Sequence, residues 1–360
     1  MIISPVHFPI YPFAPHSRQR NSFFDSSFFF SRGSWALAAG IMAIAKKRKN
    51  DAPRVWLPDY VCREPIEVLQ RFSLSIHFYP IQKNLEPDWE HCARSCADDG
   101  PPDVFVLVHY FGFPNAVIEA KNFSKEWGVD LVEDCAHVMH PFGMVGSSGS
   151  CSIFSPWKFY PIPLLGVLSV AEPLRGFVTS SPARWEIASV AHWWLKREVQ
   201  RALAAMRVPW YQRREQLPTP HSLGDPQPNA FAHRLFRNLL GAPADRIARR
   251  RRESYQSLAM FFRAHAPEMM IFGGLPSGAI PYYFPLVMKE PAKKFVARLV
   301  AHGVPATQWP TLPEVVAVDR SRPSYAHEYA DRLVLLPIHH NVSPANVEYM
   351  TSVICSVMTI

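Results

Sequence analysis

The sequence predicts an α/β protein with a doubly wound, mainly parallel sheet, followed by a smaller α+β part. Short apolar runs alternate with helical segments over the first half of the chain. Val104–Val108 is an uninterrupted apolar run, as expected for a parallel strand buried on both faces. Polar residues follow several of these runs, where ligands bind in such sheets. We expect a large domain over 1–225, with an N-terminal arm over 1–30, and a small C-terminal domain over 226–360.

The bulk composition is that of a globular protein with a large core. The chain has 360 residues, of which 48% are hydrophobic and 19% charged. Its net charge of +8 permits an anionic ligand. The arginine-rich run 246–252 is expected to form a solvated helix face, and no aromatic residues interleave with it, so we expect no nucleic-acid partner. The six cysteines lack paired metal-ligand spacing, which favours free thiols in a cytoplasmic protein. The longest apolar stretch, Trp35–Ala45, is too short to span a bilayer, so we expect no membrane partner.

Apolar runs bounded by turn residues predict the strands. They lie at 54–57, 74–79, 104–108, 129–132, 151–154, 166–170, 280–288 and 334–337. We expect the strand at 129–132 to break at Glu133–Asp134, and the strand at 166–170 to run back from the loop before it. The aromatic segment Phe23–Phe30 needs burial against the body of the protein or a partner subunit.

Helical periodicity and cap residues predict the helices. They cover 36–47, 66–69, 85–96, 116–127, 185–206, 229–240, 244–265, 292–302 and 346–358. Pro87 is expected to begin the third of these, and Gly303 to end the helix that precedes it. The segment 207–228 is polar and rich in proline, which indicates a linker or a long crossing loop.

Three chemically useful side chains follow the central predicted strands: Asp134, His137 and Lys158. A carboxylate after one strand and a lysine after the next suit pyridoxal phosphate, whose ring nitrogen pairs with a buried carboxylate and whose aldehyde reacts with an amine. Strand alternation points Glu133 to the opposite face, so Asp134 is the candidate for the ring nitrogen. Lys158 is the only lysine between residues 126 and 195 and is the candidate amine.

The same cofactor needs a phosphate site, and the start of the first helix offers one. Gly33, Ser34 and Trp35 open the helical run, so their backbone N–H groups and the Ser34 hydroxyl are candidate phosphate donors, together with Ser155. On these residues alone, a plain helix cap is the simpler explanation of Gly33–Ser34. Three motifs follow one another along the chain: Gly33-Ser34 before a helix, Asp134 and His137 after a strand, and Ser155 and Lys158 after the next strand. This joint order favours the cofactor site.

Taken together, these segments resemble the pyridoxal-phosphate-dependent sugar aminotransferases of the DegT/StrS type, which have the fold type I aminotransferase architecture. The resemblance covers most of the chain and rests on GSWAL, LPDYVC, LVHYFGFP, VEDCAHV, FSPWKFYPIPLLGVL, GVPATQWPTLP and VLLPIHHNV. It implies that Lys158 binds the cofactor covalently, that Asp134 pairs with the pyridine nitrogen, and that His137 lies near the 3′-oxygen, although a core histidine bonded to the backbone is an equal alternative for His137.

The resemblance also implies a reaction. An amino group would pass from an amino acid, typically glutamate, to a nucleotide-linked keto-sugar in polysaccharide or glycoconjugate biosynthesis. The enzyme would be a cytoplasmic homodimer with its sites at the interface.

The chain departs from the family pattern at several positions. Cys62 stands where a ring-stacking aromatic is expected, so the nearby Tyr60 becomes the candidate for that role. Ser150 replaces an acidic residue, and Leu165 replaces the first glycine of a pair. Three alternatives therefore stay open: an enzyme of the same fold and cofactor with another reaction or acceptor, a non-catalytic relative, and a metal hydrolase using Asp134, His137 and His140.

Overall fold

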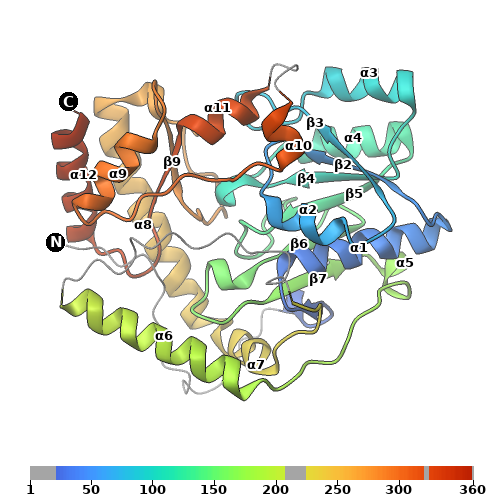
Figure 1. The fold of residues 1–360 in the computed structure, drawn as a ribbon, viewed down its shortest axis with the longest axis horizontal. Helices are drawn as coiled ribbons and strands as arrows, with labels where there is room; N and C mark the ends of the chain where they lie inside the picture. Colours follow the sequence, from blue (N-terminus) through green and yellow to red (C-terminus); the bar gives the residue numbers. More distant parts are fainter. Residues whose placement is uncertain (1–21, 207–223, 320–323, 359–360) are drawn as a thin grey trace.

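A seven-stranded sheet forms the centre of the protein (Figure 1). The computed structural model describes residues 22–206, 224–319 and 324–358. Across the sheet the strands lie in the order β1-β7-β6-β5-β4-β2-β3. Their bounds are β1 Phe28–Phe30, β2 Arg54–Pro58, β3 Ser75–Tyr79, β4 Val104–Val108, β5 Asp130–Cys135, β6 Cys151–Phe154 and β7 Gly166–Val170.

Five neighbouring strands of this sheet are parallel. They are β6, β5, β4, β2 and β3, whereas β7 runs antiparallel to β6, and β1 antiparallel to β7. The carboxyl ends of β2, β4, β5 and β6 therefore meet at one edge. At that edge the register pairs Asp134 with Val108 on one side and with Ile153 on the other.

Helices cover both faces of the sheet (Figure 1). Helix α1 (Gly33–Arg48) packs across β7, β6 and β1, with α2 (Arg63–Leu69) beside it, and α4 (Val117–Trp127) packs against β4 and β5. Helix α3 (Trp89–Asp99) lies near α4. Strand β4 shows why both faces need cover. Val104 and Val106 belong to one buried cluster with residues of α1, while Phe105 and Leu107 belong to the other, with Phe123 of α4.

The C-terminal part contains a second, two-stranded antiparallel sheet of β8 (Phe284–Val287) and β9 (Leu333–Leu336). The remaining helices are α5 Glu172–Arg175, α6 Ile187–Ala205, α7 Ala230–Leu239, α8 Ala242–His265, α9 Lys293–Ala301, α10 Glu314–Val318, α11 Tyr325–Arg332 and α12 Pro344–Met358. Helix α12 packs on α8 and α9. No helix in the described segments has the length and apolarity to cross a membrane. The division of the chain at residue 225 stays a prediction.

Strand β5 does not break at Glu133–Asp134, so that prediction is wrong. The strand continues to Cys135 because both acidic residues remain paired with β4 and β6 through their backbones. The buried Glu133 carboxylate also receives hydrogen bonds from a neighbouring loop, which removes the cost of placing a charge inside the sheet.

Other boundaries shift for local reasons. Helix α3 begins at Trp89, where Asp88 accepts a hydrogen bond from the His91 N–H at 3.0 Å, instead of at Leu85. Strand β8 begins at Phe284, later than predicted. The aromatic segment is buried against the body: Phe24 packs on Phe154 and Phe236, and its end forms β1. Residues 1–21 of the arm and 207–223 of the linker lie outside the described residues.

Candidate active site

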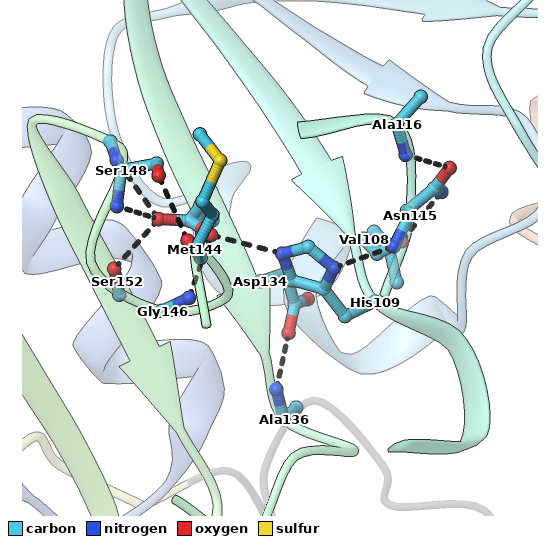
Figure 2. Close-up of polar contacts among 12 residues, drawn as sticks. Val108, His109, Asn115, Ala116, Asp134, Ala136, Met144, Gly146, Ser148 and Ser152 are labelled. Carbon is cyan, nitrogen blue, oxygen red and sulfur yellow. Dashed lines mark hydrogen bonds and ion pairs between the residues drawn. The ribbon is translucent and has the colours of Figure 1, made fainter. Parts of the chain in front are cut away.

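The two acidic residues near the end of β5, Glu133 and Asp134, have different hydrogen-bond partners. Figure 2 shows Asp134 beside Ala136 and apart from the loop of Gly146 and Ser148. Glu133 is fully buried, and its carboxylate accepts hydrogen bonds from the N–H groups of Gly146, Ser148 and Gly149 at 2.8, 2.6 and 2.9 Å. His109 Nε2 donates to the same carboxylate at 3.1 Å. Burial raises the pKa of Glu133, but the hydrogen bonds from His109 and the loop outweigh burial and hold the pKa below its ordinary value.

His109 is held in one tautomer by its two partners. Its Nδ1 accepts a hydrogen bond from the Asn115 N–H at 3.0 Å, so Nε2 carries the proton donated to Glu133. The side chain of Asn115 donates to Val108 O at 2.8 Å, which fixes the loop after β4 against the strand end. Glu133 and His109 therefore form a rigid support beneath the carboxyl edge.

Asp134 has fewer partners than Glu133. It is buried, and its Oδ1 accepts a hydrogen bond from the Ala136 N–H at 2.8 Å. Burial raises the pKa of Asp134, and the Ala136 hydrogen bond and the charge of Lys158 offset only part of this. An additional cationic or N–H partner would therefore stabilise the ionised form.

Lys158 ends the 3₁₀ turn Pro156–Lys158 that follows β6. Its charge lowers the pKa values of Asp134, His137 and Cys62, so the amine lies on the same side of the sheet edge as these three side chains. Its Nζ lies 5.7 Å from the centroid of the Tyr282 ring. The structure thus brings the predicted lysine and the predicted carboxylate into one site.

His137 lies in an aromatic stack beside this pair. Its ring is stacked with Tyr282 at 4.9 Å and with Phe111 at 5.7 Å between centroids. Its Nδ1 accepts a hydrogen bond from the Phe111 N–H at 3.3 Å. Burial, and then the charge of Lys158, hold the pKa of His137 well below its ordinary value, so the ring is neutral. It is bonded to the backbone, as in the structural alternative, and it also borders the site.

The predicted phosphate residues come together at the start of α1. A Cβ atom on Gly33 would overlap the Ser155 hydroxyl, so the missing side chain allows a close approach of the helix start to Ser155. The Ser34 hydroxyl donates to Glu64 Oε1 at 2.9 Å. The ring of Trp35 packs elsewhere, edge-on to Phe72 and under the Arg71 guanidinium, so a phosphate would meet its backbone N–H.

Tyr60 lies outside this group. Its ring is fully buried among Tyr110, Trp309 and Tyr329, and its hydroxyl donates to Trp309 O at 2.6 Å. Cys62, two residues later, is the nearer neighbour of the lysine and the carboxylate. Burial raises the pKa of the Cys62 thiol to about 12, against the lowering effect of Lys158, so the group is a neutral thiol.

Arg251 is a buried residue of the site, so the prediction of a solvated face for the run 246–252 is wrong at this position. Its guanidinium donates to Lys158 O at 3.1 Å and to Tyr282 O at 2.8 Å, and it lies 4.8 Å from the Phe159 ring centroid. Burial lowers the pKa of Arg251 to about 10, which leaves it charged at neutral pH. A signal was present in the sequence, because Arg251 shares the helical spacing of the buried Ala244, Ile247, Tyr255 and Leu258.

The metal-hydrolase alternative gains no support from this geometry. Within the described segments, one group of possible ligands clusters within 4.8 Å, and it consists of His109, Glu133 and Cys135 instead of Asp134, His137 and His140. Both nitrogens of His109 and both oxygens of Glu133 already have protein hydrogen-bond partners. The thiol of Cys135 is buried, which raises its pKa well above the ordinary value.

No protein-family model and no curated protein matches the sequence, but solved structures match its fold. A DegT DnrJ EryC1 StrS aminotransferase from Brucella abortus is 14% identical, with 92% of this chain and 85% of that one covered and a TM-score of 0.65. The GDP-4-keto-6-deoxy-D-mannose-3-dehydratase of E. coli, with bound hydrated PLP, is 15% identical, with 93% and 90% covered and a TM-score of 0.67. The aminotransferase TlmJ from Streptoalloteichus hindustanus is 18% identical, with 93% and 86% covered and a TM-score of 0.64. The predicted fold type I aminotransferase architecture is therefore confirmed.

Proposed function

We propose that this protein is a pyridoxal-phosphate-dependent aminotransferase of the DegT/StrS type that acts on a sugar. The observation that carries the proposal is the position of Lys158 just after β6, at the same carboxyl edge of the sheet as the buried Asp134 of β5 and near enough for its charge to lower the Asp134 pKa. A fold shared with solved sugar aminotransferases supports it. The raised pKa of Asp134 supports it further, because its buried carboxylate accepts one side-chain hydrogen bond from the described residues, that of the Ala136 N–H, and would gain from a new N–H partner.

The side chains present fit this cofactor at both ends. Asp134 would accept a hydrogen bond from the pyridine nitrogen, and Lys158 Nζ would hold the aldehyde carbon. The close approach of Gly33 to Ser155 forms a cradle at the start of α1, where backbone N–H groups and a hydroxyl would bind the phosphate. His137 would border the ring. When bound, pyridoxal phosphate supplies an electron-accepting ring that makes amino-group transfer possible.

The roles of the protein groups follow from their positions. Asp134 would keep the ring nitrogen protonated, which requires its own carboxylate to be ionised. Lys158 Nζ would be the base that takes a proton from the substrate α-carbon. Arg251 and the Tyr282 ring hold the lysine segment in place, since the guanidinium bonds both backbones.

The names of the matching structures support a class of substrate for this protein. Several matching structures carry the names of sugar enzymes, among them the aminotransferase CalS13 and an aminotransferase of pseudoaminic acid biosynthesis, PseC. We therefore infer an amino-acid donor, typically glutamate, and a nucleotide-linked keto-sugar acceptor. A homodimer in the cytoplasm is part of the same proposal.

A second function deserves a test because one matching structure is a 3-dehydratase of a keto-deoxy sugar nucleotide. The same fold and cofactor would then serve a reaction other than amino transfer. Cys62, which borders Lys158 and Asp134 where the family has an aromatic ring, favours a changed ring environment and keeps this alternative open.

Absorption spectra of the purified protein separate these functions. Added pyridoxal phosphate should give the visible band of the lysine-bound cofactor, and Lys158→Ala should lack it. Glutamate should then convert the bound cofactor to its amine form, and a nucleotide-linked keto-sugar should restore the band. Absence of a band in the wild type would refute every enzymatic proposal that uses this cofactor. A band that no amino acid converts would favour the other reaction or a non-catalytic relative.

A further inference from the structure

A carboxylate lies at the end of the site where the phosphate is expected. Glu64, in the first turn of α2, accepts a hydrogen bond from the Ser34 hydroxyl at 2.9 Å through Oε1. Its Oε2 accepts from Arg32 Nη1 at 3.4 Å. Both oxygens of Glu64 are thus engaged by the residues on either side of Gly33.

The position of Glu64 relative to the site follows from its neighbours. Gly33 approaches Ser155 at the start of α1. The Glu64 charge also contributes to the raised pKa of Cys62, whose thiol responds to Lys158 and Asp134 as well. Glu64 therefore lies at the border between the lysine–carboxylate pair and the start of α1, and its side chain is 27% exposed, so it has room to move.

Both groups that Glu64 engages lie at the start of α1: Ser34 is a predicted phosphate donor, and Arg32 is the N-cap residue, whose guanidinium is chemically able to bind a phosphate. A serine hydroxyl has one proton to donate, so Ser34 cannot donate to Glu64 and to a phosphate at once. A guanidinium binds carboxylate and phosphate with the same donor geometry. A carboxylate and a phosphate that share these donors also repel each other.

We propose that Glu64 is a built-in competitor of the cofactor phosphate, which holds Ser34 and Arg32 in the cofactor-free protein and releases them when the phosphate binds. This inference rests on the proposed function, because it concerns the phosphate of the same cofactor. It assigns Glu64 a role in setting cofactor affinity, in addition to connecting α1 with α2.

Paired titrations of wild type and Glu64→Gln test the proposal. Pyridoxal phosphate and pyridoxal differ in the phosphate alone, so only the phosphorylated ligand should respond. We expect Glu64→Gln to lower the Kd for pyridoxal phosphate about tenfold, which corresponds to one charge-assisted hydrogen bond, and to leave the Kd for pyridoxal unchanged. Glu90→Gln, on α3 with a side chain 81% exposed, is the charge-matched control and should change neither value.

Thermal melts with inorganic phosphate test the role of Glu64 without the cofactor. Inorganic phosphate should raise the Tm of Glu64→Gln more than that of the wild type, whether or not either protein binds pyridoxal phosphate. Glu64→Asp shortens the carboxylate without removing its charge and should give an intermediate Kd; it also replaces Glu64→Gln if that variant fails to fold.

Three results would overturn the inference. One is an unchanged or weakened affinity of Glu64→Gln for pyridoxal phosphate, with a lower Tm, which would make Glu64 a purely structural connection between α1 and α2. Another is an equal gain for pyridoxal, which would indicate a general charge effect. The third is an equal response of both proteins to inorganic phosphate. If the wild type binds neither pyridoxal compound, the proposed function fails, and the inorganic phosphate melts still decide the role of Glu64.

Discussion

Two adjacent carboxylates, Glu133 and Asp134, illustrate how one strand separates a structural charge from a functional one. Glu133 receives several N–H donors, which lower its pKa in spite of burial. Asp134 receives one backbone donor and its pKa rises. The difference comes from the loop 146–149, whose backbone N–H groups donate to Glu133.

Asp134→Asn should stabilise the cofactor-free protein and abolish tight cofactor binding. Because folding raises the pKa of Asp134, its favourable contribution is complete below the unfolded pKa and is lost as the pH rises through the folded pKa. At neutral pH the ionised carboxylate therefore lowers stability, and asparagine removes that cost while keeping an oxygen for the Ala136 N–H. We expect the Tm to rise by roughly 2 °C or more, measured by calorimetry without cofactor. A lower Tm would contradict this assignment.

Glu133→Gln should destabilise the folded protein. Each Glu133 oxygen accepts from at least two donors, so the glutamine NH₂ group would face donors at either position. We expect a loss of about 3 kcal/mol in the free energy of unfolding, measured by urea denaturation. Ser152→Ala is the control, because the Ser152 hydroxyl donates to Glu133 over the long distance of 3.4 Å. Loss of this weak hydrogen bond should lower the free energy of unfolding by less than about 1 kcal/mol. Equal losses in both variants would refute the special position of Glu133.

At the residue scale, the sequence predicted positions better than partners. Strand alternation separated Asp134 from Glu133 correctly, because the side-chain period of a strand is fixed by the backbone. It did not predict that Glu133 organises a loop 13 to 16 residues later in the chain. Nor did it predict the contact of Ser34 with Glu64, since such contacts depend on how two helices pack.

At the element scale, predictions succeeded for short, mainly apolar runs between turn residues. The runs Val104–Val108, Cys151–Phe154 and Gly166–Val170 have the bounds predicted for them, because such runs leave little choice of structure. Strand β1 was not predicted, because Phe28–Phe30 becomes a strand only by pairing with the edge of β7. Arg251 was placed on a solvated face because its charge concealed a position on the buried stripe of α8.

Gly166→Ala tests how β7 positions the start of α1. A Cβ atom at Gly166 would overlap the carbonyl of Arg32 and would lie 2.7 Å from Gly33 N, which are backbone atoms that cannot rotate away. The first turn of α1 must then shift, so we expect a loss of about 2–3 kcal/mol in stability and a weaker visible band with pyridoxal phosphate. Gly176→Ala is the matched control, because a Cβ there meets nothing within 4 Å. The argument fails if both variants behave alike.

At the scale of the whole molecule, hydrogen bonds between the C-terminal part and the segments after β2 and β3 join residues about 250 positions apart. Tyr60, after β2, donates to Trp309 O, and Tyr329 of α11 donates to Lys83 O. Ser324 donates to Asp59 and accepts from the Ala326 N–H, which caps α11. No local pattern predicts such pairs, because they depend on how the C-terminal part is placed against the sheet. Tyr60, which stays a predicted neighbour of the cofactor ring, is one of the residues of this junction.

Asp59 should make this junction sensitive to pH. Burial raises the pKa of Asp59 to about 6, although Ser324 and the Ile81 N–H oppose the shift. Its contribution to stability is therefore complete below the unfolded pKa of 3.8 and is lost as the pH rises through about 6. Asp59→Asn cannot ionise, so it should stabilise the protein by about 2–3 kcal/mol at pH 7.5 and by much less at pH 4.5.

Urea denaturation of both proteins at the two pH values measures the difference. Asp51→Asn, at an exposed position, controls for the loss of one negative charge and should change stability far less at pH 7.5. A stabilisation by Asp59→Asn that is the same at both pH values would show that the ionisation of Asp59 does not govern the junction. A stabilisation confined to the higher pH would show that the C-terminal part is held against the sheet more weakly once Asp59 is ionised, since Asp59 is the sheet's partner for Ser324 at the start of α11.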